Sequence, residues 1–220
     1  MNNYFKSKLL RENPSVVHFF GNKNFITPNK EEVFFLHQVH STKVVNLDDE
    51  MVKLSNQLDG DAIVTSIKGL FLGVKTADCV PILITSTSGI FVSAVHSGWR
   101  GTYNEIVRNV IEDIIENYKL NRDDLVCAIG PSIGLCCYEV SSAMYLKFRD
   151  KFDLDNDNYR FIEGKHFLNL ANINKKIINN CGVFNVESIT NCTGCDGGFF
   201  SYRADGSRDK SQISIIKTIR

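Results

Sequence analysis

Hydrophobic residues recur along the chain with two different periods, and these periods predict strands through most of the first half and helices mainly in the second. Short runs rich in Val, Ile and Phe, bounded by Gly, Ser, Asn and Asp, predict β-strands. In the first half these runs are Val16–Phe20, Glu32–Val39, Lys43–Leu47, Ala62–Ser66, Leu70–Thr76, Pro81–Thr85 and Ile90–Val95. Three later runs predict further strands at Val126–Gly130, Val183–Ile189 and Ile213–Ile219.

The clearest helix is predicted over Tyr103–Tyr118, where apolar residues repeat at the spacing of one helix face. Thr102 and Glu105 form a capping-box pattern that would start this helix.

Two further helices follow. One begins after Ser141 or Ser142 and runs through Phe152, and the other spans Leu170–Asn180, with Gly182 as its C-terminal stop. The mixed order of elements predicts one α/β (α+β-type) layered domain over residues 1–220, with a largely antiparallel sheet core and flanking helices.

Composition narrows the classes of function. The 220 residues are 43% hydrophobic and 23% charged, with 25 basic and 25 acidic side chains and no net charge. This balance argues against a broad nucleic-acid-binding surface. No apolar run approaches the roughly 20 residues that span a bilayer, and the first residues lack a signal-peptide pattern. We therefore expect a cytoplasmic protein without a membrane or nucleic-acid partner; the sequence leaves its oligomeric state open.

Seven cysteines, an odd number with two adjacent, make a poor disulfide framework. We expect four of them to be small buried apolar residues: Cys127, Cys136, Cys137 and Cys181. The segment from Cys192 to Cys195 resembles a zinc half-site or a redox pair. A second Cys-x-x-Cys pair is absent, so we do not expect a structural zinc ribbon.

His40, Cys79 and His96 are the residues most suggestive of chemistry. One thiolate and two imidazoles suit zinc, and three protein ligands leave a fourth position for water or substrate. Cys79 could instead be a buried structural cysteine. Its neighbour Asp78 could orient a ligand histidine or act as a hydrogen-bonded turn residue. His37 would lie on the opposite face of the strand from His40, so the two should not bind one ion.

A glycine-flanked segment joins His96 to the predicted helix start at Thr102. Arg100 within it offers a planar, two-pronged donor for phosphate or carboxylate, and a helix start favours an anion. Alternatively, Arg100 simply pairs with an acid. Arg203 is a second arginine that could line the same pocket or lie on the surface.

These segments, taken together, resemble the YfiH/laccase-domain family, once described as polyphenol oxidases and now associated with purine nucleoside phosphorolysis and deamination. The matching segments are Leu36–Ser41, Leu58–Ala62, Thr76–Pro81, Ala94–Gly101, Ile129–Gly134, Cys136–Val140, Cys192–Cys195 and Phe200–Arg203. Two features differ from the family pattern. Gly21–Lys30 is short and lacks the usual Ser-Leu-Asn-type motif, and Arg208-Asp209-Lys210 replaces Thr-Gly-Arg.

The resemblance implies a zinc enzyme acting on adenosine, inosine and methylthioadenosine with phosphate, and deaminating adenosine. It implies His40, Cys79 and His96 as metal ligands and catalytic residues. Substrate-binding residues would be Arg100, Arg203, Asp61 and Asp78, the last two also being candidates for protonating the departing purine.

Three other functions stay open. One is a copper-dependent phenol oxidase, although five histidines without a His-x-His pair weigh against its multicopper form. Another is a metal-free Cys79–His96 hydrolase or transferase of the kind that edits peptidoglycan precursors. The last is a non-enzymatic metal-binding module.

Overall fold

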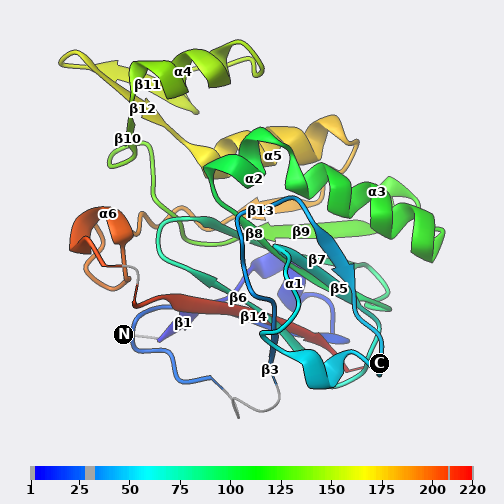
Figure 1. Cartoon of the computed structure of the whole chain (residues 1–220). Coiled ribbons are helices and arrows are strands. Elements are labelled where there is room, and N and C mark those ends of the chain that lie inside the picture. Colours follow the sequence, from blue (N-terminus) through cyan, green and yellow to red (C-terminus); the bar gives the residue numbers. More distant parts are fainter. Residues whose placement is uncertain (1–2, 28–32, 208, 220) are drawn as a thin grey trace.

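The computed structural model describes residues 3–27, 33–207 and 209–219. Two β-sheets lie face to face, and helices cover the outer face of one of them (Figure 1). A small sheet with one helix projects from one end of this body. This is the predicted α+β layered architecture with mostly antiparallel strands.

The outer sheet has five strands in the order β1-β2-β14-β6-β3. All its neighbours are antiparallel except β3 and β6. Its strands are β1 (Tyr4–Phe5), β2 (Val16–Gly21), β14 (Gln212–Thr218), β6 (Phe71–Thr76) and β3 (Val33–Phe35).

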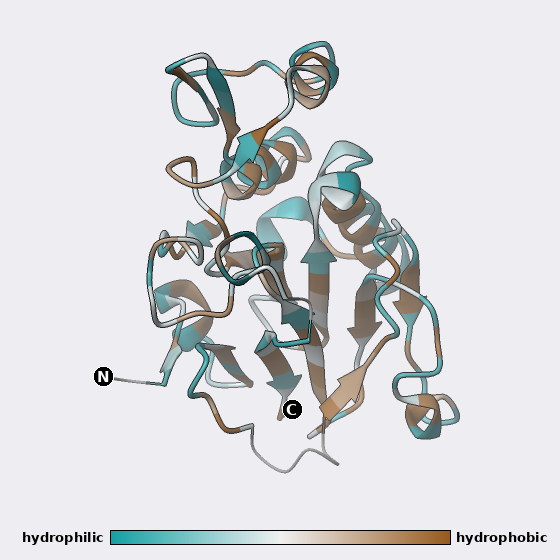
Figure 2. Cartoon of the chain, turned by 60° about the vertical axis from the view of Figure 1, so that its left-hand side comes forward, coloured by the Kyte–Doolittle hydropathy of each residue, from teal (hydrophilic) through white to brown (hydrophobic). Residues whose placement is uncertain are grey.

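The inner sheet has six strands in the order β13-β9-β7-β8-β5-β4, with parallel pairs at its two edges. Its strands are β13 (Val186–Ser188), β9 (Leu125–Ile129), β7 (Val80–Ser86), β8 (Val92–Ser97), β5 (Ala62–Thr65) and β4 (Val44–Asn46). Side chains alternate across each strand, so Ile82 and Ile84 face the helices while Leu83 faces the outer sheet. Because both faces are covered, β5, β7 and β9 are mostly apolar along their length. Much of the strand ribbon in Figure 2 is accordingly brown.

Three helices cover the inner sheet: α2 (Trp99–Tyr103), α3 (Ile106–Tyr118) and α5 (Leu170–Asn180). The projecting part contains β10 (Glu139–Val140), α4 (Ser142–Arg149), β11 (Tyr159–Ile162) and β12 (Lys165–Leu168). The short helices α1 (Lys8–Arg11) and α6 (Tyr202–Asp205) and two 3-10 turns, η2 (Val52–Leu54) and η3 (Arg122–Asp124), complete the described elements. Among the helices described, none combines the length and apolar character needed to cross a membrane.

The predicted helix over Tyr103–Tyr118 is wrong at its start. The chain is helical from Trp99, breaks at Glu105, which has φ 56°, and resumes at Ile106. Glu105 is the N-cap residue of α3, but its side chain makes no capping hydrogen bond; its carboxylate pairs with Arg108 and Lys151 instead. An ion pair to α4's C-terminal side thus replaces the predicted capping box.

The predicted strand Glu32–Val39 is also shorter than expected. Its first residue lies outside the described part of the chain, and the strand ends at Phe35. Between Phe35 and the start of β4 the described chain forms one isolated bridge, between His37 and Asp59. The chain leaves the sheet here to form the loop that carries His40.

Candidate metal centre and active site

Three chain segments bring His40, Cys79 and His96 together. His40 lies in the loop between β3 and β4, Cys79 in the turn between β6 and β7, and His96 near the end of β8. One possible ligand atom from each residue lies within 4.8 Å of the others. The two imidazole rings are nearly perpendicular, with centroids 4.8 Å apart. One ion can therefore be reached by all three side chains.

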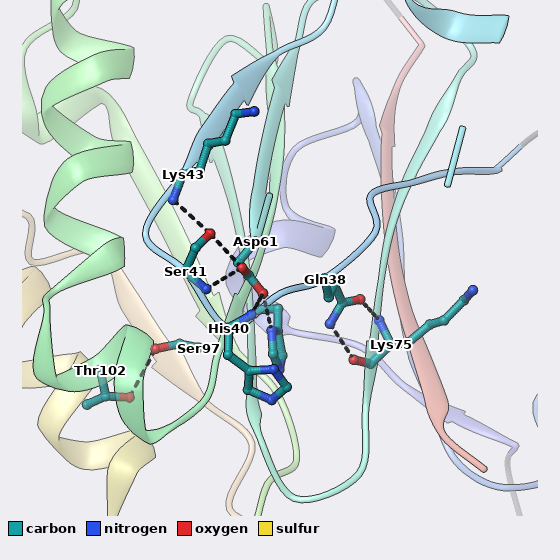
Figure 3. Close-up of polar contacts among 9 residues, drawn as sticks. Gln38, His40, Ser41, Lys43, Asp61, Lys75, Ser97 and Thr102 are labelled. Carbon is teal, nitrogen blue, oxygen red and sulfur yellow. Dashed lines mark hydrogen bonds and ion pairs between the residues drawn. The ribbon is translucent and has the colours of Figure 1, made fainter. Parts of the chain in front are cut away.

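The His40 loop is held in place by hydrogen bonds rather than by a sheet (Figure 3). His40 has φ 58°, a left-handed conformation that non-glycine residues seldom adopt. The backbone N–H groups of His40 and Ser41 donate to the Asp61 carboxylate at 3.0 and 2.5 Å. The Gln38 amide pairs with both backbone groups of Lys75 at 2.8 Å. These bonds fix the direction in which His40 projects.

Asp61 connects His40 to His96. Its side chain is buried and lies 2.7 Å from Nδ1 of His96, which is itself only 3% exposed. Burial opposes ionisation of Asp61, but hydrogen bonds from His96 and Ser41 outweigh it and lower the pKa of the carboxyl group. Burial also opposes a charge on His96, yet Asp61 and Cys79 raise its pKa to about 9. The carboxylate therefore holds the Nδ1 proton and leaves Nε2 for the other side of the ring.

Cys79 is prepared to ionise in this setting. Burial alone would raise the pKa of its thiol, but His40 and His96 lower it to about 6. Gly98 lies against the cluster, and a Cβ atom there would come within 3.0 Å of the Cys79 sulfur and 3.1 Å of the His40 ring. A side chain at this position would force one or both of the two ligand side chains to shift.

Of the two alternatives for Asp78, the structure shows the hydrogen-bonded turn residue. Thr193 Oγ1 and the backbone N–H of Arg203 each donate to its carboxylate at 2.7 Å. Asp78 itself has φ 83° in the turn before Cys79. The carboxylate that orients a histidine is Asp61, which the family resemblance had suggested as a substrate contact or proton donor.

A cavity of about 710 Å³ opens beside the three residues. Four cationic side chains line it: Lys75, Arg100, Arg203 and Lys210. Its apolar lining comes from Trp99, Ile133, Tyr138, Met144 and Leu170. Asp78 lines it as well, whereas Asp61 does not. The lining thus mixes four cationic side chains and two carboxylates, Asp78 and Glu139, with apolar and aromatic side chains.

Both predicted arginines lie at this cavity. The Arg100 guanidinium is exposed and lies 4.7 Å from the Trp99 ring centroid. Arg203 donates from Nη1 to the Glu139 carbonyl oxygen at 2.6 Å, over the ring of Tyr138. Because α2 begins at Trp99, Arg100 lies inside its first turn. The buried hydroxyl of Thr102, predicted to start the helix, instead bonds to Ser97 and Asn174.

Sequence reasoning missed part of this lining. Lys75 lies just before a family-matched segment, Tyr138 drew notice only as part of one, and Lys210 belongs to the segment that departs from the family pattern. Arg208 in that segment lies outside the described residues, as do Pro28–Lys30 of the shortened N-terminal segment. His37 lies at the cavity but outside the three-residue cluster, 66% exposed and 2.7 Å from Asp59.

Comparison with known proteins identifies the family of this chain. Residues 22–218 match the family model described as multi-copper polyphenol oxidoreductase laccase. The chain belongs to the YfiH/laccase-domain family. A similar protein of Clostridium acetobutylicum, named purine nucleoside phosphorylase, is 32% identical over 194 residues, which cover 86% of this chain and 78% of that one.

Other members of the family add to the comparison. A protein from an unidentified prokaryote, named adenosine deaminase RL5, is 32% identical over 187 residues, covering 80% of this chain and 68% of that protein. The solved structure of the hypothetical protein YfiH of Bacillus licheniformis has the same fold. Its TM-score is 0.84 at 24% identity, over 99% of this chain and all of the other.

Proposed function

We propose that this protein is a zinc-dependent purine nucleoside enzyme. It cleaves adenosine, inosine and methylthioadenosine with phosphate and also deaminates adenosine. The observation that carries the proposal is the convergence of His40, Cys79 and His96 beside a cavity whose lining contains both cationic and aromatic side chains. The names of the relatives supply the substrate class.

The donor set fits zinc. One thiolate and two imidazoles are borderline and soft ligands of the kind that zinc prefers, and three of them leave one position open. The buried Asp61 behind His96 is the carboxylate–histidine pairing common at zinc centres. Bound by these residues, zinc would supply Lewis-acid activation of a water molecule or of a substrate oxygen.

The family description refers to several coppers, but the histidines do not support such a centre. His18 accepts a hydrogen bond from the Ser7 backbone, and His166 stacks on Tyr145. Within the described residues, the second set of possible ligands contains only cysteines. A site made of two histidines and one cysteine favours a single zinc ion at that site over a multicopper cluster.

Other residues at the site would bind phosphate, bind the purine and position His96. Arg100 and the neighbouring cations would hold phosphate, since guanidinium groups bind phosphate with two parallel hydrogen bonds. Tyr138 and Trp99 offer apolar surface for the purine. Asp61 keeps His96 in one tautomer and has no oxygen directed into the cavity, so it positions rather than binds.

The proposal is tested with adenosine and phosphate. Ribose 1-phosphate reports phosphorolysis and ammonia reports deamination. We expect both products from the wild-type protein. Arg100→Ala should lower the rate of ribose 1-phosphate formation by at least about 30-fold, which corresponds to about 2 kcal/mol for one lost charged contact. Ammonia formation should change much less, because attack by water needs no bound anion.

Arg149→Ala is the matched control, since Arg149 is exposed and does not line the cavity. It should leave both rates unchanged. Equal losses in the two reactions for Arg100→Ala would show that Arg100 is a general substrate or scaffold contact. If metal-loaded wild-type protein forms neither ribose 1-phosphate nor ammonia, the proposed activity itself is refuted.

One observation favours a second candidate, a metal-free Cys79–His96 enzyme that cleaves or transfers acyl groups. The Cys79 sulfur lies within 4.8 Å of a His96 ring nitrogen, and this contact lowers the pKa of the thiol and raises the pKa of the imidazole, as in the thiolate–imidazolium pair of cysteine nucleophiles. Removal of the metal separates the two candidates. A thiolate nucleophile should stay active without metal and be inactivated by iodoacetamide, whereas a zinc enzyme should lose activity with its metal.

A further inference from the structure

Four cysteines form a second cluster away from His40, Cys79 and His96. Cys136 and Cys137 follow β9, and Cys192 and Cys195 follow β13. All four sulfur atoms lie within 4.8 Å of one another. The sequence had suggested that Cys136 and Cys137 are buried and that the Cys192–Cys195 pair has no partner. The first expectation is wrong, because Cys136 is exposed and Cys137 is half-buried. A second Cys-x-x-Cys is absent as expected, but the adjacent Cys136–Cys137 pair lies beside the Cys192–Cys195 pair.

We propose that Cys136, Cys137, Cys192 and Cys195 bind a second metal ion, a structural zinc held by four thiolates. Zinc–sulfur bonds of about 2.3 Å in a tetrahedron place neighbouring sulfurs about 3.8 Å apart. The observed sulfurs are already close to that arrangement, with Cys136 and Cys195 3.6 Å apart. Four protein ligands close the coordination shell, which is typical of a structural site.

The two turns are shaped to bring the sulfurs together. The Gly134 N–H donates to the Cys192 sulfur at 3.1 Å, a contact that stabilises a thiolate. A Cβ atom at Gly194 would come within 2.8 Å of the Cys137 Cβ, so the close approach of the turns requires glycine there. The Thr193 N–H also bonds to the Ser132 carbonyl at 3.0 Å. These contacts join the two turns even before an ion is considered.

The compactness of the cluster favours a single ion. An iron–sulfur cluster places several irons and sulfides between its cysteines, which would spread the four sulfurs farther apart. A disulfide would use two thiols and leave two others, and all seven cysteines have free thiols in the structure. Cys127 and Cys181, by contrast, are buried in the core and lie outside the cluster.

The site lies next to the wall of the active-site cavity. Thr193, inside the Cys192–Cys195 turn, donates to Asp78, the residue before Cys79. Tyr138 follows the other pair and lines the cavity. A zinc ion at the four cysteines would therefore hold this wall, and with it the Cys79 turn, in position. Its role would be to order the site rather than to contact substrate.

Metal content per chain, measured by elemental analysis of purified, zinc-loaded and desalted protein, tests the proposal. We expect two zinc ions per wild-type chain. The variant Cys136→Ala/Cys195→Ala should keep only the zinc ion at His40, Cys79 and His96. The variant Cys79→Ser/His96→Ala should keep only the zinc ion at the four cysteines. Cys181→Ala, which removes a buried cysteine outside the cluster, should keep two. If the proposed nucleoside activity is wrong, the zinc ion at the four cysteines should still be found. The two proposals can therefore fail independently.

X-ray absorption of the Cys79→Ser/His96→Ala variant gives a readout that does not depend on removing a cluster cysteine. We expect four sulfur neighbours at about 2.3 Å from zinc. A wild-type chain with one zinc ion, unchanged by Cys136→Ala/Cys195→Ala, would overturn the proposal. So would iron at the site, or alkylation mapping that finds a disulfide among the four cysteines.

Discussion

Replacing Asp61 with asparagine should weaken both the fold and metal binding at the His40, Cys79 and His96 centre. The carboxylate accepts four hydrogen bonds: one oxygen takes those of His40 N and His96 Nδ1, and the other takes those of Ser41 N and Oγ. An amide has one oxygen, so its NH₂ group must face a backbone N–H that cannot accept. The Ser41 hydroxyl can rotate to accept from the amide, but its backbone N–H cannot.

The change therefore leaves one partly buried donor, the Ser41 N–H, without its charged acceptor, which costs about 1.5–3 kcal/mol in the free energy of unfolding. Loss of a carboxylate behind a ligand histidine typically lowers metal affinity about 10- to 100-fold. Urea unfolding measures the first quantity, and competition with a chromophoric chelator measures the second. The stability comparison uses metal-free protein, so that the two effects stay separate.

Asp59→Asn is the matched control. Asp59 lies at the same 2.7 Å from a histidine, His37, but both side chains are more than half exposed. We expect a change of less than about 0.5 kcal/mol and unaltered metal affinity. If the two asparagine variants behave alike, Asp61 does not organise the centre as inferred from its contacts.

Two other predictions concern packing and pH. Gly98→Ala should lower metal affinity by pushing Cys79 and His40 apart, whereas Gly197→Ala, which has open space, should not; equal affinities in chelator competition would contradict this. His18 is buried, and burial together with Lys6 lowers its pKa from 6.5 to about 4. Between these values the unfolded chain binds a proton that the folded chain does not. Stability should therefore be full above pH 6.5 and fall by about 3 kcal/mol as the pH drops to 4. His18→Gln should flatten this part of the stability–pH curve, and an unchanged curve would contradict the assignment.

The parts of the fold that could be predicted from sequence are those buried on both faces or along one helix stripe. The α5 helix matches its predicted bounds, Leu170–Asn180, because its apolar stripe and Gly182 both mark it. The hairpin of β11 and β12 was missed, since its short strands are largely exposed and Phe161 faces solvent. Its residues do not alternate between apolar and polar in the way that predicts a strand.

Part of the site, too, could be predicted from the sequence and part could not. Residue chemistry and family motifs pointed to the three mixed ligands, but the position of Asp61 depends on a loop and a strand that meet only in the folded chain. The four-cysteine cluster escaped notice because the rule for paired cysteines expects two residues between them. Cys136 and Cys137 are adjacent, and a turn rather than spacing brings both sulfurs to one point.

Product analysis of inosine turnover tests the central claim most directly. Purified wild-type protein and His40→Ala, checked for equal folding, are incubated with inosine with and without phosphate, and hypoxanthine, ribose 1-phosphate and ribose are resolved. We predict equal amounts of hypoxanthine and ribose 1-phosphate from the wild type, only when phosphate is present, and neither product from His40→Ala. Hypoxanthine with free ribose in the absence of phosphate, or undiminished turnover by His40→Ala, would contradict phosphorolysis at this metal centre.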